Sequence, residues 1–136
     1  MRFLLDANVL LALGYTRHQA HPRVGSWVAA LRRAGGVDFA TCAITELAFV
    51  RVGAAVGYSV DVIMARNALA ALKASRAAAF VLLPDGLGAE SLPLWASTPG
   101  RTTDGHLYAL AKHHGVELAT LDTGIPNAFL IPPCVV

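Results

Sequence analysis

The sequence has few of the features that would cross-link a chain or place it in a membrane. It contains two cysteines in 136 residues, Cys42 and Cys134, and they form no Cys-x-x-Cys pair. A disulfide framework or a cysteine-ligated zinc site therefore has little support. The apolar runs are the size of a strand or a short helix, well below the roughly 18 residues of a spanning helix. We therefore predict a chain that does not cross a membrane.

Signals for export and for nucleotide binding are missing as well. Asp6 interrupts the first apolar run, Phe3 to Leu5, before it reaches the roughly 7 residues of a signal-peptide core. We therefore expect a cytoplasmic protein. The glycines form no phosphate-binding loop, because Gly86 and Gly88 are only a weak match and no Gly-Lys-Ser or Gly-Lys-Thr follows them.

Apolar residues are abundant instead. Hydrophobic residues make up 55% of the chain and charged residues 15%, and the mean hydropathy is +0.53. This composition excludes a disordered chain. The length fits one domain, residues 1–136, with a sizeable core. Because so small a domain cannot hide all of this apolar surface internally, we expect another chain to cover part of it.

Short apolar runs alternate with helical patterns along the chain. Apolar runs predict strands, and apolar residues spaced by three and four predict helices. The predicted strands are 3–5, 39–42, 80–83, 118–121 and 129–131, and the predicted helices are 9–13, 22–34, 44–55, 62–72, 90–95 and 103–114. Thr102 or Thr103 is the predicted N-cap of the last helix. The pattern predicts one α/β domain with a parallel sheet covered on both faces.

Acidic residues stand where the predicted strands end or helices begin. Asp6 follows the strand 3–5, and Asp122 follows the strand 118–121. Because open parallel sheets bind ligands at the carboxyl ends of their strands, both acids should face the expected site. Asp104 lies in the first turn of the helix 103–114. Glu46 lies among apolar neighbours at the start of the helix 44–55, where its charge needs a partner.

Four carboxylates in one crevice would repel one another unless a cation lay between them. Oxygen ligands select Mg²⁺ or Mn²⁺, and such a metal can polarise a phosphate oxygen and activate water for phosphodiester hydrolysis. If four of the nine acids bind metal, the 11 basic residues face only five acids on the remaining surface, which suits a polyanion. The candidate basic residues are Arg32, Arg33, Arg66, Lys73, Arg76 and Arg101.

Other interpretations remain open. Asp6 and Asp104 could each cap a helix and Asp122 could form a turn, in which case the protein is a non-catalytic binding module. A phosphohydrolase with Asp6 as nucleophile is a further alternative, but it would want a second acid at the position of Asn8. His106 is two residues from Asp104, on nearly the opposite side of the helix, so we predict a structural role for it.

Four segments of the sequence together resemble the ordered acidic motifs of PIN-domain ribonucleases: Leu4-Leu5-Asp6-Ala7-Asn8, Thr45-Glu46-Leu47, Arg101-Thr102-Thr103-Asp104 and Leu118-Ala119-Thr120-Leu121-Asp122. The similarity is greatest to the VapC-type toxins of bacterial toxin–antitoxin pairs, and it spans nearly the whole chain. It implies a PIN-like three-layer α/β/α fold with a central parallel sheet of four to five strands.

The resemblance also implies a function. It implies an endoribonuclease that cleaves RNA with metal-activated water, forms a homodimer and is inhibited by a cognate antitoxin near the active site. Asn8 and Thr120 would support the acids by hydrogen bonds. Gly105 replaces an alanine common in relatives, which would loosen the helix start. Carried over by position, the residues of the Mg²⁺ (or Mn²⁺) site are Asp6, Glu46, Asp104 and Asp122, with Asp6 and Asp104 as direct ligands.

Overall fold

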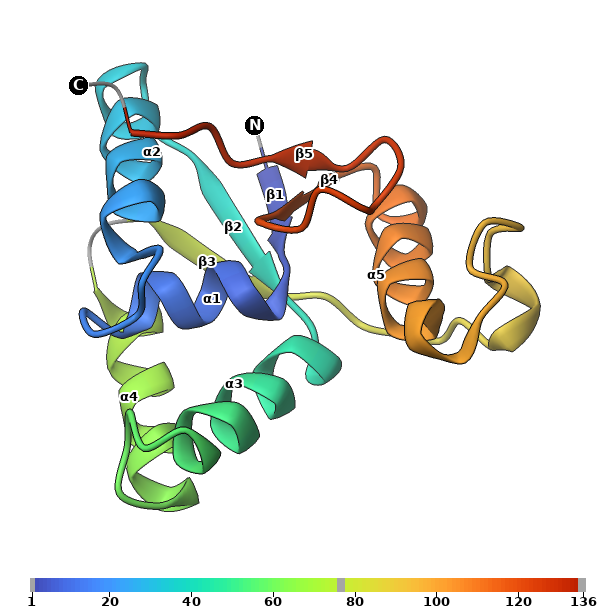
Figure 1. The fold of residues 1–136 in the computed structure, drawn as a ribbon. Helices are drawn as coiled ribbons and strands as arrows, with labels where there is room; N and C mark the ends of the chain where they lie inside the picture. Colours follow the sequence, from blue (N-terminus) through green and yellow to red (C-terminus); the bar gives the residue numbers. More distant parts are fainter. Residues whose placement is uncertain (1, 76–77, 135–136) are drawn as a thin grey trace.

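The computed structural model describes residues 2–75 and 78–134. At its centre is a five-stranded, entirely parallel sheet in the order β3-β2-β1-β4-β5 (Figure 1). The strands are β1 (Arg2–Leu5), β2 (Asp38–Thr41), β3 (Ala79–Leu82), β4 (Glu117–Thr120) and β5 (Phe129–Leu130). All five predicted strands and their parallel arrangement are confirmed. Arg76, one of the predicted basic residues, lies outside the described residues.

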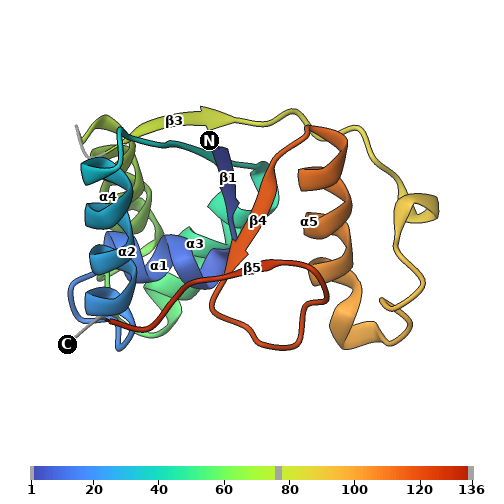
Figure 2. The same ribbon diagram turned by 90° about the horizontal axis from the view of Figure 1, so that it is seen from above.

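Helices cover the sheet on both faces. Figure 2 shows α1 to α4 on one side of the sheet and α5 on the other, so the fold has the three predicted layers. Among the described residues, no α-helix is longer than 13 residues, and none could cross a membrane. The helices are α1 (Ala7–Gly14), α2 (His21–Arg33), α3 (Ala43–Ala55), α4 (Val62–Ala74) and α5 (Thr102–His113), with short 3-10 turns η1 (Ala89–Ser91) and η2 (Pro99–Arg101).

The central strand β1 explains why its sequence is a continuous apolar run. Successive side chains of a strand point to opposite faces of a sheet. Phe3 and Leu5 are buried in the cluster formed with α1 and α2, whereas Leu4 is buried against Leu107 and Leu110 of α5. Both faces of β1 therefore contact a helical layer, as expected for a central parallel strand.

The strand β3 is less buried than its sequence predicts. Its apolar run predicts a strand covered on both faces, but Val81 is 37% exposed and Leu82 is 53% exposed. β3 lies at one end of the strand order and pairs only with β2. An apolar run does not distinguish an edge strand from a central one, so this part of the prediction is wrong.

Two predictions for the region before α5 also fail. The predicted helix 90–95 is reduced to the single turn η1, Ala89–Ser91. The predicted N-cap of α5 is wrong as well, because the cap position is Arg101, with no side-chain hydrogen bond, and the Thr102 hydroxyl donates to the Pro99 carbonyl at 3.0 Å. The reason is that η2 runs directly into α5, so the preceding turn supplies the first contacts of the helix.

Gly105 in α5 is required by a close approach of the preceding segment. It is buried, and a Cβ at this position would overlap the Cβ of Ala96 and lie 3.3 Å from side-chain atoms of Leu92 and Pro93. α5 runs through Gly105 without a break. The glycine therefore serves packing of the segment 92–96 against α5, rather than loosening the helix.

We expect Gly105→Ala to destabilise the protein by about 1–3 kcal/mol, the usual cost of overpacking, although alanine favours helix by about 1 kcal/mol. Urea unfolding would measure the change. Gly25→Ala in α2 is the matched control, because no neighbouring atom lies within 4 Å of the position that a Cβ would take there, and it should stabilise the protein. A Gly105→Ala protein as stable as the Gly25→Ala protein would contradict the packing argument.

Candidate active site

The candidate site lies at the edge of the sheet where β1 and β4 end. α1 begins directly after β1, and α5 runs so that its amino end reaches the same edge (Figure 1). β1 and β4 are paired neighbours with Leu5 opposite Ala119, and the Asp6 N–H donates to the Ala119 carbonyl at 2.9 Å. The sheet pairing therefore fixes the backbone at Asp6 beside the end of β4.

Asp6 is held by two hydrogen bonds and is only 7% exposed. Its Oδ1 accepts from the Ala7 N–H at 2.7 Å, which makes it the N-cap of α1, and its Oδ2 accepts from Thr120 Oγ1 at 2.7 Å. Burial raises the pKa of Asp6, these two bonds lower it in part, and the charge of Asp122 raises it further. The Asp6 carboxylate therefore both caps α1 and belongs to the candidate site.

Asp104 lies in the first turn of α5 and is partly buried. Burial is the main cause that raises its pKa, and the negative charges of Asp6 and Asp122 raise it further, against a lowering by Arg101. The three aspartates therefore interact electrostatically although 98 residues of sequence separate Asp6 from Asp104. Three of the four predicted acids share this edge of the sheet.

Thr120 links two of these acids, as predicted. Its hydroxyl donates to Asp6 and accepts from the Asp122 N–H at 3.0 Å, while Asp122 Oδ1 accepts from the Gly124 N–H at 2.7 Å. Asn8 acts differently from the prediction. Its Oδ1 accepts from the Leu121 N–H at 3.3 Å, so it contacts the backbone beside Asp122 rather than a carboxylate.

Glu46 has the polar partners that the sequence predicted it would need among its apolar neighbours. Its Oε2 accepts from Thr41 Oγ1 at 2.5 Å and from Lys73 Nζ at 2.7 Å. The two side chains of the ion pair are only 21% and 30% exposed for Glu46 and Lys73. The sequence indicated the need for a partner but not its identity, because Lys73 lies on α4, 27 residues further along the chain.

The acids fit Mg²⁺ or Mn²⁺ because they supply oxygen ligands, but their side chains are not arranged around one metal position. Within residues 2–75 and 78–134, no three Asp, Glu, His or Cys side chains form a group close enough to hold a metal ion. Mg²⁺ commonly binds one or two carboxylates and keeps several waters. Partly desolvated carboxylates that repel one another supply such oxygen ligands, and a cation between them would relieve the repulsion.

His106 has the structural role predicted for it. Its Nε2 lies 2.5 Å from Asp85 Oδ2, and this pair connects α5 with the segment after β3. His114, the C-cap residue of α5, similarly contacts the Pro84 carbonyl through Nε2 at 2.8 Å. Both imidazoles are therefore engaged in holding residues 84 and 85 against α5.

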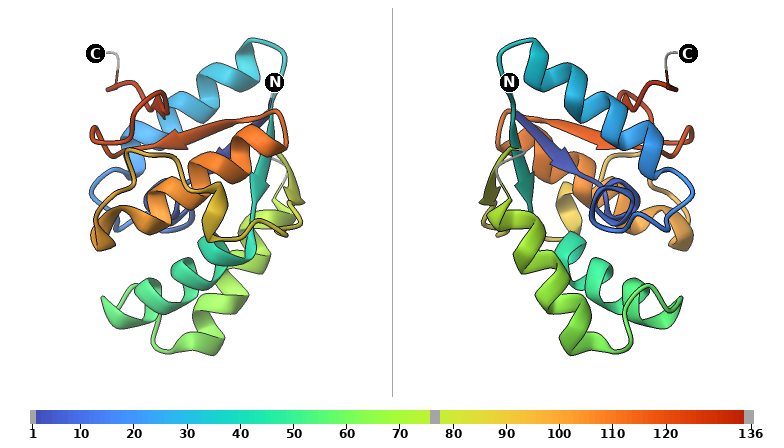
Figure 3. Two further views of the ribbon diagram at one scale, coloured as in Figure 1. Left: turned by 90° about the vertical axis from the view of Figure 1, so that its right-hand side faces the viewer. Right: turned by 90° about the vertical axis from the view of Figure 1, so that its left-hand side faces the viewer.

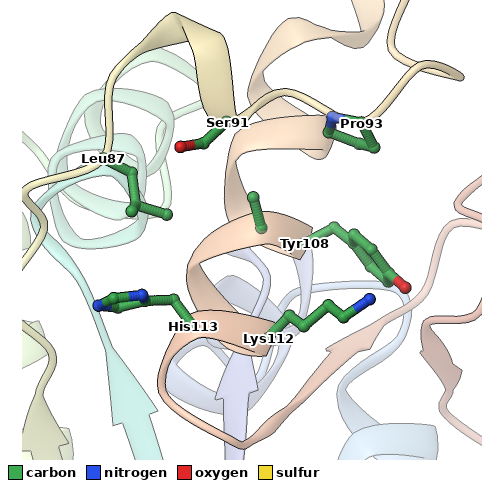
Figure 4. A pocket seen from close by; sticks show the side chains of 7 residues that line it. Leu87, Ser91, Pro93, Tyr108, Lys112 and His113 are labelled. Carbon is green, nitrogen blue, oxygen red and sulfur yellow. The ribbon is translucent and has the colours of Figure 1, made fainter.

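Two hollows of similar size occur in the described part of the chain. One, of about 450 Å³, lies over the outer side of α5, where Leu87, Tyr108 and Lys112 point into it, and none of the four acids lines it (Figure 4). The other, of about 460 Å³, is lined by Glu46 together with Arg66 and Lys73 of α4. The sequence predicts that Arg66 and Lys73 share one basic stripe of a helix, but it does not predict the hollow that they line with Glu46.

Comparisons with known proteins agree with this architecture. The family model for the PIN domain matches residues 3–128. Three similar proteins of Mycobacterium tuberculosis are ribonuclease VapC38, 35% identical over 90% of this chain and 86% of the relative, ribonuclease VapC29, 34% identical over 97% and 98%, and ribonuclease VapC39, 32% identical over 94% of each. The order of the acidic motifs, the parallel sheet and these matches agree, and the chain belongs to the PIN-domain family, as a member of the VapC type.

Proposed function

We propose that the protein is a Mg²⁺-dependent endoribonuclease that acts as the toxin of a toxin–antitoxin pair. The observation that carries the proposal is the group of Asp6, Asp104 and Asp122 at one edge of the sheet, where burial and then the charges of neighbouring acids raise the pKa of Asp6 and Asp104. The names of the relatives support RNA as the substrate. Mn²⁺ fits the same oxygen ligands.

Each of these three aspartates has a definite part in this proposal. Asp6 and Asp104 would hold the metal directly, with Asp122 beside them. The metal, when bound, supplies positive charge that polarises the scissile phosphate and activates water for in-line attack on phosphorus. The Ala7 N–H and the Thr120 hydroxyl each hold one oxygen of Asp6, so its carboxylate keeps one orientation.

Helix capping does not explain all of the acids. Asp6 does cap α1, but Asp104 accepts no cap hydrogen bond, because the N-cap position of α5 is occupied by Arg101 without a side-chain cap. Asp104 is instead partly buried beside two other negative charges, an arrangement that costs stability unless a cation binds. This placement favours a metal site over a non-catalytic binding module.

Protein partners are part of the proposal: a cognate antitoxin and a second copy of this chain in a cytoplasmic homodimer. The pair formed by α3 and α4 projects from the rest of the molecule (Figure 3). Apolar side chains that are more than half exposed gather on α3, on α4 and at the end of α3: Leu47, Val56, Val62, Ile63 and Met64. Exposed apolar groups of this kind support a covering protein.

The direct test is cleavage of total cellular RNA by the purified chain, freed of any bound partner. We expect discrete fragments with Mg²⁺ or Mn²⁺ and intact RNA with EDTA, and sequencing of the fragment ends would identify the cleavage sites. A folded, metal-replete, partner-free chain that cleaves none of this RNA would contradict the proposal.

A further inference from the structure

The cavity between α3 and α4 combines an apolar floor with two positive charges. It measures about 460 Å³ and is lined by three small or aliphatic side chains of α4 and three charged ones: Leu69, Ala70 and Ala74, with Glu46, Arg66 and Lys73. The cavity lies between the two helices that pack most extensively on each other, the pair seen in Figure 3. Its charged groups therefore lie on two helices that pack on each other.

Arg66 and Lys73 lie on the same face of α4. Seven residues separate them, which is two helical turns, and the two positions are about 10 Å apart along the helix axis. No acid in the described ranges forms an ion pair with Arg66. With Lys73 and one acid, Glu46, the lining carries a net positive charge, which favours an anionic ligand.

Glu46 fixes the position of the Lys73 ammonium. One carboxylate oxygen, Oε2, receives both Lys73 Nζ at 2.7 Å and the hydroxyl of Thr41 at 2.5 Å, and Thr41 is completely buried. An ammonium group has three donors, and Glu46 uses one of them. The other two remain for a ligand in the cavity, and the flexible lysine stem is already ordered before that ligand arrives.

The candidate active site and Glu46, which lines the cavity, follow neighbouring strands of the sheet. β1 and β2 are paired neighbours, with Leu4 opposite Ala40. Asp6 follows the end of β1, and Glu46 lies in the first turn of α3, which follows β2. An RNA strand with its scissile phosphate at Asp6 and Asp104 would therefore bring a flanking phosphate to the adjacent strand end.

We propose that the cavity between α3 and α4 is a subsite for a backbone phosphate next to the scissile bond, formed by Arg66 and Lys73, and that Glu46 positions Lys73 instead of binding the metal. The inference rests on the proposed ribonuclease activity. It assigns the four acids to two tasks: Asp6 and Asp104, with Asp122 beside them, would serve the metal, and Glu46 orders a cation that binds substrate.

Binding of fluorescein-labelled polyuridylate in EDTA would test the subsite without cleavage. Phosphate contacts do not depend on base sequence, so this probe need not be the natural substrate. We expect Arg66→Gln and Lys73→Met each to lower the slope of log affinity against log salt by about 0.7, which weakens binding about fivefold at 0.1 M salt. Arg2→Gln, at the amino end of β1 and with a side chain that is 45% exposed, is the control and should retain the wild-type slope.

Glu46→Gln tests the second half of the proposal through thermal stability. The Mg²⁺ concentration that gives half of the stabilisation should stay within about twofold of the wild-type value, because Glu46 is not a ligand. A variant that no longer responds to Mg²⁺ would assign Glu46 to the metal and overturn the proposal. So would Arg66→Gln and Lys73→Met proteins that bind polyuridylate like Arg2→Gln, or a wild type that does not bind it. Failure of the wild type to cleave RNA would instead contradict the proposed function.

Discussion

Asp104→Asn should fold, lose RNA cleavage by at least about 100-fold, and become more stable than the wild type in metal-free buffer at neutral pH. The expected loss is large because even groups that only support a metal ligand commonly cost 10- to 100-fold on removal, and Asp104 is proposed to touch the metal itself. Asparagine keeps the size of the side chain but removes the negative charge. Fragment yields from total RNA, compared at equal protein concentration, would measure the effect.

The gain in stability follows from the sign of the pKa shift. The pKa of Asp104 is raised above its ordinary value of 3.8 in the folded protein, chiefly by burial and then by Asp6 and Asp122. The folded protein therefore binds the proton more tightly than the unfolded chain does, and stability falls as pH rises through the interval between the two pKa values. At pH values above the raised pKa, the ionised Asp104 side chain destabilises the folded wild-type protein in full. Asparagine carries no charge and does not cause this destabilisation.

Urea unfolding of both proteins between pH 8 and pH 4, without metal, would check this sign. The free energy of unfolding of Asp104→Asn should exceed that of the wild type at pH 8, and the difference should shrink as pH falls toward 3.8. Retained cleavage in the pure variant would remove Asp104 from the site. A variant that is less stable than the wild type at pH 8 would show that Asp104 is mainly a structural group.

Mg²⁺ should stabilise the wild-type protein strongly. A ligand that binds only the folded state adds about 2.7 kcal/mol at a concentration 100 times its Kd, which corresponds to a rise in Tm of roughly 10 °C for a chain of this size. The cation would also relieve the repulsion that raises the pKa of Asp6 and Asp104. Thermal melts over a Mg²⁺ series, with Ca²⁺ and Na⁺ at matched ionic strength, would separate specific binding from screening.

The response should depend on the acids that bind the metal. Asp104→Asn should lose most of the stabilisation by Mg²⁺, while Asp38→Asn should keep it, because Asp38 lies at the start of β2 and pairs with Arg2 at 3.7 Å. Equal melting temperatures of the wild type with and without Mg²⁺ would favour the binding-module alternative. These melts need no RNA, so they test the metal site separately from the choice of substrate.

The sequence was sufficient to predict how strands and helices follow one another along the chain, because their hydrophobic periodicity is local. Phe3 to Leu5 and the residues around Val24 and Trp27 carry signals that depend on neighbours within a few positions. The exposure of Val81 and Leu82 depends instead on which strand lies at the sheet edge. That information is absent from any local pattern.

The same distinction applies to the site. Asp6 and Asp122 could be placed because each follows a strand, and parallel strands present their carboxyl ends at one edge. The pairing of Glu46 with Lys73 could not be placed, since it depends on how α4 packs against α3. The close contact of Ala96 with Gly105 could not be predicted either. Ala96 lies in the long connection between β3 and α5, where the sequence has no periodic pattern.

The hydrogen bond from Thr120 to Asp6 joins positions 114 residues apart, and this separation has a consequence for biosynthesis. β1 is synthesised well before its neighbour β4 and before the acids Asp104 and Asp122. Pairings between such distant segments close late in folding, because the loop entropy must be overcome first. A nascent chain on the ribosome therefore lacks the assembled carboxylate site until β4 and Asp122 have been synthesised.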